Sequence, residues 1–226
     1  MSLFGRYGSD YRRVVFFQRL IKPSREKAFE AAVGGAFDQI GELERDLLVA
    51  EGLRDDGLIV DIGCGAGRLA VRLRDRPQLS YVGIDVVPEL LEFAKQAAQR
   101  PDWRFDLVSK TEIPCDAGAA SMCAAFSVFT HLPENTCLAY LAEMRRVLKR
   151  DGVAVFSFLD ADLPAHQKLL RDGVRCFLLT RTAFARNIGY SKGRISEWAA
   201  RSGFAVKRIE SPSRLGQSIA VFKRED

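Results

Sequence analysis

The stretch Leu58-Ile59-Val60-Asp61-Ile62-Gly63-Cys64-Gly65-Ala66-Gly67-Arg68 decides the fold of this chain. Its first half is a short β-branched run, which predicts a fully buried strand. Its second half is rich in glycine and leads into apolar residues at helical spacing. Glycines at such a place let the backbone turn sharply and let a ligand lie against bare main chain, beside the free N–H groups of a helix N-terminus. The stretch therefore predicts a strand–loop–helix unit that binds a ligand.

Strands and helices alternate on both sides of this unit. A helical pattern precedes it at residues 37–52, and others follow at 88–97 and 133–150. Further strands are predicted at 81–85, 103–108, 119–128 and 153–159. This alternation indicates an α/β fold, a parallel sheet with helices on both faces. Residues 160–190 have weak periodicity, Ser191 is a predicted N-cap, and two strands at 204–209 and 217–222 follow. Their short link makes that pair antiparallel.

An acid ends the second strand of the unit. Asp85 stands 24 residues after Asp61, where a carboxylate can accept hydrogen bonds from both hydroxyls of a ribose. Val86 follows it and can pack on a purine ring. A dinucleotide loop has the spacing G-x-G-x-x-G, but its third glycine would fall at Arg68. The spacing here is G-x-G-x-G, which argues against a nicotinamide oxidoreductase.

The sequence resembles the class I S-adenosylmethionine-dependent methyltransferases. The matching segments are VDIGCGAGR at 60–68, YVGIDVVP at 81–88, SVFTHLP at 127–133 and LAEMRRVLKRDGVAVFSF at 141–158. The resemblance covers roughly residues 35–226. It implies a Rossmann-like sheet of seven strands in the order 3-2-1-4-5-7-6, with strand 7 antiparallel. We expect a single domain over 1–226, made of an N-terminal cap (1–35) and a catalytic core (36–226) with a lid-like insertion at 160–190.

The resemblance also implies S-adenosylmethionine as cofactor and a role for each matching residue. The methionine part is expected at Asp61, Gly63, Cys64, Gly65 and Gly67, the ribose at Asp85 and the adenine at Val86. The backbone after the fourth strand, from Phe126, is expected to face the methionine amino group. The family commonly has an Asp after strand three that binds the adenine amino group. Ser109 takes that place here, and Lys110 follows it.

Two residues are candidates for catalysis, because methyl transfer sometimes requires a base. His131 follows the fourth strand and Asp160 ends the fifth, and ligands of open α/β sheets lie beyond the carboxyl ends of strands. A histidine that only fixes the loop and a solvated aspartate are the plainer alternatives. The other histidine, His166, lies in the weakly periodic segment. The sequence offers no cluster at metal-ligand spacing, so no metal site is predicted.

Composition limits the class of protein. The chain has 226 residues, 47% of them hydrophobic, and a net charge of +5. No apolar run is long enough for a membrane span, and no secretory signal is expected. The number of cysteines is odd and none form a C-x-x-C pair, which favours a reducing, cytoplasmic location. They are Cys64, Cys115, Cys123, Cys137 and Cys176.

The charge is uneven along the chain. Residues 1–30 carry a net +4, residues 31–165 a net −7 and residues 166–226 a net +8. Solvated helix faces account for this pattern most simply. Alternatively, a cleft rimmed by the two basic ends would attract an anionic acceptor. We therefore expect methylation of a small molecule, or of a glycan or lipid head group, with an acidic or phosphorylated acceptor favoured. Methylation of nucleic acid or protein is a second hypothesis, and a non-catalytic cofactor-binding protein is a third. No nucleic-acid partner is expected, and the sequence does not determine the oligomeric state.

Overall fold

The computed structural model describes residues 36–180 and 187–225, with only the backbone for 173–180. Of the N-terminal segment it describes a scattered set: 8–10, 12, 13, 15, 16, 18, 22, 24 and 27. Much of the predicted cap therefore lies outside the described residues, as does part of the predicted insertion.

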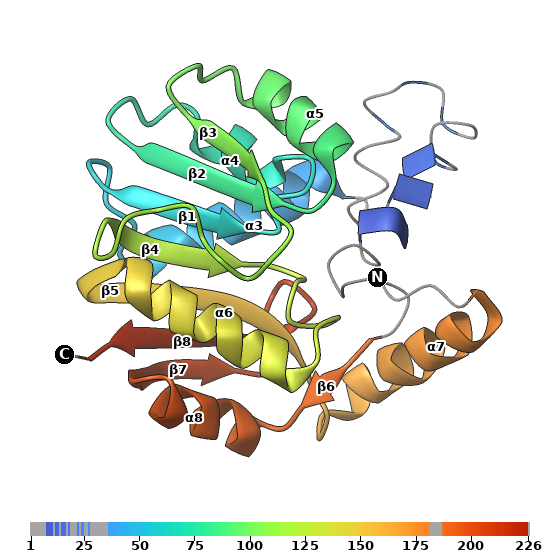
Figure 1. The fold of residues 1–226 in the computed structure, drawn as a ribbon. Helices are drawn as coiled ribbons and strands as arrows, with labels where there is room; N and C mark the ends of the chain where they lie inside the picture. Colours follow the sequence, from blue (N-terminus) through green and yellow to red (C-terminus); the bar gives the residue numbers. More distant parts are fainter. Residues whose placement is uncertain are drawn as a thin grey trace.

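A twisted sheet forms the centre of the molecule (Figure 1). Its strands lie in the order β3-β2-β1-β4-β5-β8-β7. Strands β1 to β5 are parallel, whereas β8 runs antiparallel to both β5 and β7. With β7 and β8 as the sixth and seventh strands, this confirms the predicted order. The bounds are β1 Leu58–Ile62, β2 Ser80–Asp85, β3 Arg104–Leu107, β4 Ala120–Ala125, β5 Leu148–Asp160, β7 Phe204–Glu210 and β8 Ser218–Arg224.

Helices cover both faces of the sheet because alternate strand residues point to opposite sides. Val60 and Ile62 pack with residues of α6 (Glu134–Val147) and α8 (Lys192–Arg201) in one core. Ile59, which precedes Val60, packs with residues of α3 (Phe37–Ala50) and α4 (Arg68–Leu73) in a second core. Helix α5 (Pro88–Ala98) begins with its proline in the first turn, as the sequence predicts.

The structure corrects two of the sequence predictions. Helix α6 ends at Val147, so Lys149 and Arg150 are not its last turn but belong to β5, where Leu148 pairs with Ala120. The weakly periodic segment contains a regular helix, α7 (Pro164–Thr180), followed by a short strand β6 (Gly189–Tyr190) that pairs in parallel with the end of β5. A buried histidine and a central glycine hide the helical pattern of α7.

Chain order reverses between β1 and β4, which are neighbours in the sheet. Helices after β1 and β4 leave toward opposite faces at this point, so a crevice opens beyond the carboxyl ends of the strands. The glycine loop after β1 and the turn after β4 both lie at this edge.

Candidate active site

The glycine loop is fixed to the neighbouring strand. The N–H groups of Gly63 and Cys64 both donate to the carbonyl oxygen of Ile84, at 2.8 and 3.1 Å. The three glycines have φ angles of 70°, 53° and 79° (Gly63, Gly65, Gly67), in the left-handed region that glycine adopts without strain. The loop therefore holds its N–H groups in a single arrangement beyond β1.

Asp85 is clamped by backbone donors. Its Oδ2 accepts from Gly65 N at 2.9 Å and its Oδ1 from Val87 N at 2.9 Å. Burial raises the pKa of this carboxyl, and the hydrogen bonds from Gly65, Val87 and Val86 oppose that shift. A carboxylate has about four acceptor sites, so each oxygen keeps capacity for a ligand hydroxyl. The predicted ribose acid is thus oriented before a ligand arrives.

Asp61 belongs to a buried polar network beneath the loop. It is 4% exposed, and Tyr81 Oη donates to its Oδ2 at 2.6 Å. Glu44 of α3 and Arg68 of α4 form an ion pair of 2.6 Å beside it. Burial raises the pKa of Asp61 to about 7, while the Tyr81 hydrogen bond works in the opposite direction. Burial likewise raises the pKa of Glu44, opposed by Arg68.

This pKa gives a testable effect on stability. Because the folded-state pKa of Asp61 lies above its unfolded value, its protonated form stabilises the folded state at low pH, and that contribution is lost as the pH rises from about 4 to about 7. Asp61→Asn should remove this loss of folding stability, which amounts to at most about 1.4 kcal/mol for each pH unit of that interval. Urea unfolding should then show the variant more stable than the parent at pH 8 and similar to it at pH 4. Tyr81→Phe tests the same account in the opposite direction. It removes the hydrogen bond that lowers the pKa of Asp61, so the loss of stability should extend to higher pH than in the parent. Equal pH profiles for the parent and Asp61→Asn would contradict this account.

A pocket of about 620 Å³ is lined by Val86, the residue that follows Asp85. Val86, Val108 and Ser109 line it from the strand ends, and described residues of the N-terminal segment line it from the other side. A Cβ placed on Gly8 would stand 3.0 Å from the carbonyl oxygen of Val86. The N-terminal segment therefore closes over the predicted adenine position. Ser109 lines that pocket, and both Ser109 and Lys110 beside it are exposed.

The turn after β4 begins with Phe126, a predicted site residue, which is buried. It also contains Ser127, which the sequence did not single out and which has a φ of 58°. Ser127 N donates to Ser157 Oγ at 2.7 Å, and Gln217 Nε2 donates to Ser127 Oγ at 3.0 Å. The serine lies within the SVFTHLP segment, but no local signal connects it to a glutamine 90 residues away. His131 is half-buried in the same turn, and its N–H donates to Val128 O at 3.1 Å.

Asp160 and His166 lie together at the end of β5, both buried. Asp160 N donates to His166 Nδ1 at 2.8 Å, and the carboxylate of Asp160 accepts from Ser211 Oγ at 2.7 Å. His166 Nε2 lies 3.2 Å from the carbonyl oxygen of Gly216. Since Nδ1 accepts a hydrogen bond, the neutral ring carries its proton on Nε2 and donates it to Gly216. The pair therefore ties α7 to the turn between β7 and β8.

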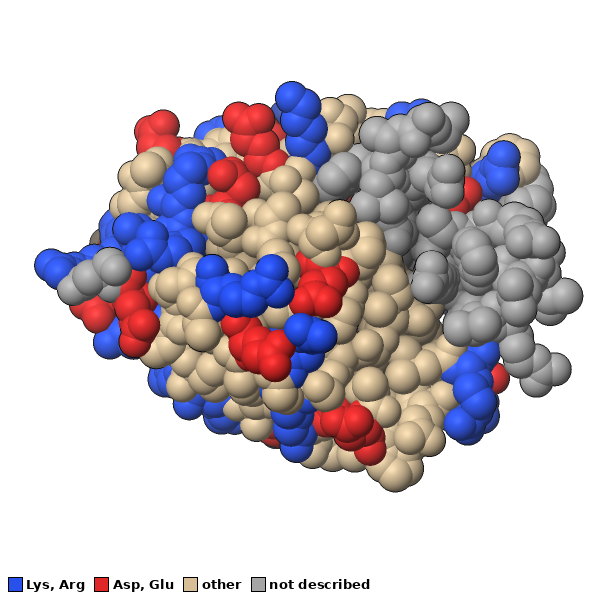
Figure 2. Space-filling model, turned by 60° about the horizontal axis from the view of Figure 1, so that its bottom comes forward, with Lys and Arg blue, Asp and Glu red and all other residues tan. Residues whose placement is uncertain are grey.

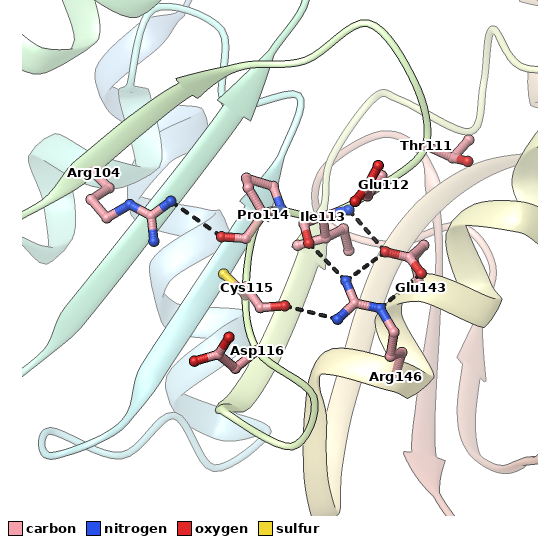
Figure 3. Close-up of a pocket in the computed structure, with 9 residues that line it drawn as sticks. All are labelled: Arg104, Thr111, Glu112, Ile113, Pro114, Cys115, Asp116, Glu143 and Arg146. Carbon is pink, nitrogen blue, oxygen red and sulfur yellow. Dashed lines mark hydrogen bonds and ion pairs between the residues drawn. The ribbon is translucent and has the colours of Figure 1, made fainter.

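A second, open groove of about 580 Å³ lies between α6 and the chain that leads from β3 to β4 (Figure 3). Arg146 donates to the carbonyl oxygens of Ile113 and Cys115 at 2.7 and 2.8 Å. Glu143 accepts from Ile113 N at 2.9 Å, and its hydrogen bond with Arg146 lowers the pKa of this carboxyl. Glu143 and Arg146 thus use their hydrogen bonds to fix the chain between β3 and β4 to α6.

Four basic residues of the C-terminal third form ion pairs with two glutamates from earlier in the chain. Lys207 and Arg208 of β7 both contact Glu51, at 2.9 and 2.6 Å. Arg194 and Arg201 of α8 share Glu134, at 3.8 and 3.5 Å. On the face shown in Figure 2, basic and acidic side chains alternate. The acidic middle of the sequence thus pairs with its basic end.

Comparison with known proteins assigns the family. A family described as "Methyltransferase domain" matches residues 59–152, which include the glycine loop, Asp85 and the turn after β4. The chain thus contains a methyltransferase domain at residues 59–152. Its fold is similar to the magnesium protoporphyrin IX methyltransferase (ChlM) of Synechocystis PCC 6803 with bound S-adenosylmethionine, at a TM-score of 0.69 and 16% identity, covering 100% of this chain and 98% of that one. That structure contains bound S-adenosylmethionine, the cofactor that the sequence predicts for this chain.

Two curated relatives of the methyltransferase domain are named for their acceptors, which are trans-aconitate and malonyl-[acyl-carrier protein]. One is a trans-aconitate 2-methyltransferase of Azoarcus sp., 31% identical and covering 60% of this chain and 52% of the relative. Another is a malonyl-[acyl-carrier protein] O-methyltransferase of Geobacter sulfurreducens, 34% identical over 49% of this chain and 41% of the relative. The chain spans about half the length, or less, of these relatives.

Among the residues that the structure describes, no helix is both long and apolar enough to cross a membrane. Within the same residues, no three His, Cys, Asp or Glu side chains gather as metal ligands.

Proposed function

We propose that this protein transfers the methyl group of S-adenosylmethionine to a small acidic molecule. The observation that carries the proposal is the carboxylate of Asp85, which Gly65 N of the glycine loop and Val87 N hold in place next to Val86 of the 620 Å³ pocket. That carboxylate is suited to the two ribose hydroxyls, and Val86 and Ser109 to the adenine. The methionine part then lies along the loop from Gly63 to Gly67, with Asp61 and Cys64 beneath it. The sulfonium supplies an electrophilic methyl group.

The acceptor is proposed to lie beyond β4 and β5. His131 is the candidate to contact it, because it is half-buried in the turn after β4. For Asp160, the bonds to Ser211 and Asp162 N support a positioning role rather than the catalytic role predicted from the sequence. The names of the two relatives favour an acid over a glycan or lipid head group. Any site for the anionic group of the acceptor is therefore proposed at His131.

The N-terminal segment is proposed to act as the cap of the site. Val15 is 3% exposed and packs with Ala66 of the glycine loop and with Val87 and Leu90. Arg12 forms an ion pair of 3.5 Å with Glu89 of α5. These contacts support closure over the adenosine end of the cofactor. Closure excludes water, which favours alignment of donor and acceptor.

Methyl transfer can be measured directly with S-adenosylmethionine labelled in its methyl group. The purified protein is incubated with a panel of small di- and tricarboxylic acids that includes trans-aconitate, and in parallel with total tRNA and with a protein extract. We expect label in an extractable small ester and none above background in RNA or protein. Label confined to RNA or protein would instead support the macromolecular alternative. Cofactor binding without transfer to any acceptor in the panel would count for the non-catalytic one.

A further inference from the structure

Gln217 lies in the turn between β7 and β8, at the edge of the sheet where the parallel strands end. Ser218, next to it, pairs with Phe158 near the end of β5. The carbonyl oxygen of Gln217 accepts from both N and Oγ of Ser213, at 2.9 and 2.6 Å. Gly216, the residue before Gln217, accepts a hydrogen bond at its carbonyl oxygen from His166 Nε2. These hydrogen bonds fix the backbone at Gln217, and with it the position from which the side chain extends.

Only one end of the Gln217 carboxamide is satisfied by the protein. Its Nε2 donates to Ser127 Oγ, and Ser127 is itself held by Ser157. Its Oε1 is buried and accepts no hydrogen bond from any residue in the described part of the chain. Burying an acceptor without a donor costs free energy, and such costs are tolerated at functional sites where a ligand supplies the partner.

The surroundings indicate which ligand group is near. Val128, the neighbour of Ser127, abuts the glycine loop so closely that a Cβ on Gly63 would stand 2.4 Å from its Cγ2. The turn that anchors Gln217 thus borders the loop proposed to hold the methionine part of the cofactor. That part carries an ammonium, which donates hydrogen bonds, and a carboxylate, which a carboxamide oxygen disfavours. An ammonium also makes the stronger, charge-assisted kind of hydrogen bond.

We propose that Gln217 is a cofactor-binding residue whose Oε1 accepts a hydrogen bond from the ammonium of S-adenosylmethionine. The inference rests on the proposed placement of the methionine part beside Gly63. In this proposal His166 and Asp160 are positioning residues, because they form hydrogen bonds with Gly216 and Ser211 of the turn that carries Gln217. Recognition of the cofactor would then involve β8, three strands away from the glycine loop in the sheet.

The test compares two ligands and two variants by calorimetry. The ligands are S-adenosylhomocysteine and its analogue with hydrogen in place of the amino group. Gln217→Leu should weaken binding of S-adenosylhomocysteine by roughly 10- to 100-fold, the range for a hydrogen bond to a charged group. It should leave binding of the deaminated analogue within about twofold of the parent, because that ligand lacks the donor. Gln217→Glu keeps an acceptor oxygen and should bind S-adenosylhomocysteine at least as tightly as the parent.

Gln167→Leu is the matched control, since Gln167 is exposed on α7 and the change in chemistry is the same. It should bind both ligands as the parent does. Parent-like binding of S-adenosylhomocysteine by Gln217→Leu would overturn the proposal. An equal loss for both ligands would also overturn it, because that result assigns Gln217 to the shape of the turn alone. Failure of the parent itself to bind S-adenosylhomocysteine would defeat the placement of the cofactor, and this inference with it.

Discussion

Replacing Gly65 with valine is expected to abolish binding of S-adenosylmethionine while the protein remains folded. Gly65 has a φ of 53°, a conformation that a β-branched residue adopts only with strain. Its N–H also donates to Asp85 Oδ2. Any shift of the backbone that relieves the strain therefore moves the donor that orients the ribose acid. In addition, the new side chain would occupy space beside the cofactor. Calorimetry with S-adenosylhomocysteine should show at least about a 100-fold loss, since more than one such contact is removed.

Gly118→Val provides the matched control for backbone strain. Gly118 has a φ of 68°, and a Cβ placed there meets nothing within 4 Å. It precedes β4 at the edge of the sheet opposite the glycine loop. The two variants should lose similar thermal stability, but only Gly65→Val should lose the cofactor. A folded Gly65→Val protein of normal affinity would show that the cofactor does not approach this loop.

Asp85→Ala should weaken cofactor binding by about 1.5–3 kcal/mol, the range for hydrogen bonds to a charged group, which is roughly 10- to 150-fold in the dissociation constant. The carboxylate is the one acceptor that Gly65 N and Val87 N hold in place at the pocket, so its loss removes both a ribose contact and the order of the loop. Adenosine should be affected by the same factor as S-adenosylhomocysteine, because both contain the ribose.

Asp106→Ala removes a carboxylate from the neighbouring strand and tests whether charge alone matters. Asp106 pairs with Arg104 at 2.6 Å on the outer edge of the sheet. We expect unchanged affinity for both ligands. If Asp85→Ala bound adenosine normally, the ribose would have to be placed elsewhere.

The order of the sheet and the position of the cofactor loop could be predicted from sequence because both depend on local patterns. The β-branched run at 58–62, the three glycines after it and the acid at Asp85 lie within 30 residues, and strand alternation gives the rest. Helix α7 was missed because His166 and Gly173 interrupt its apolar pattern. His166 is nevertheless buried, since both ring nitrogens have backbone partners that only the folded chain brings to it.

The carboxamide of Gln217 could not be found in this way. Its partner Ser127 lies in the turn after β4, and Ser157, which holds Ser127, lies in β5. No spacing in the sequence predicts that these residues meet. The environment of Asp61 is similarly non-local, because its pKa depends on burial under α3 and on the hydroxyl of Tyr81. Sequence patterns identify ligand-binding backbone well, whereas the polar side chains that tune a site depend on tertiary contacts.

The ion pair between Glu44 and Arg68 has an evolutionary consequence. Arg68 occupies the place of the third glycine in a dinucleotide loop, and its partner Glu44 is only 2% exposed. A single mutation of Arg68 to glycine would leave a buried, uncompensated charge, at a cost of about 3–5 kcal/mol. That is much of the stability of a typical domain. A change from this loop to a nicotinamide-binding loop would therefore pass through a poorly folded intermediate unless Glu44 changed first. Glu44, on the helix before the loop, thus makes a change of cofactor specificity harder to reach.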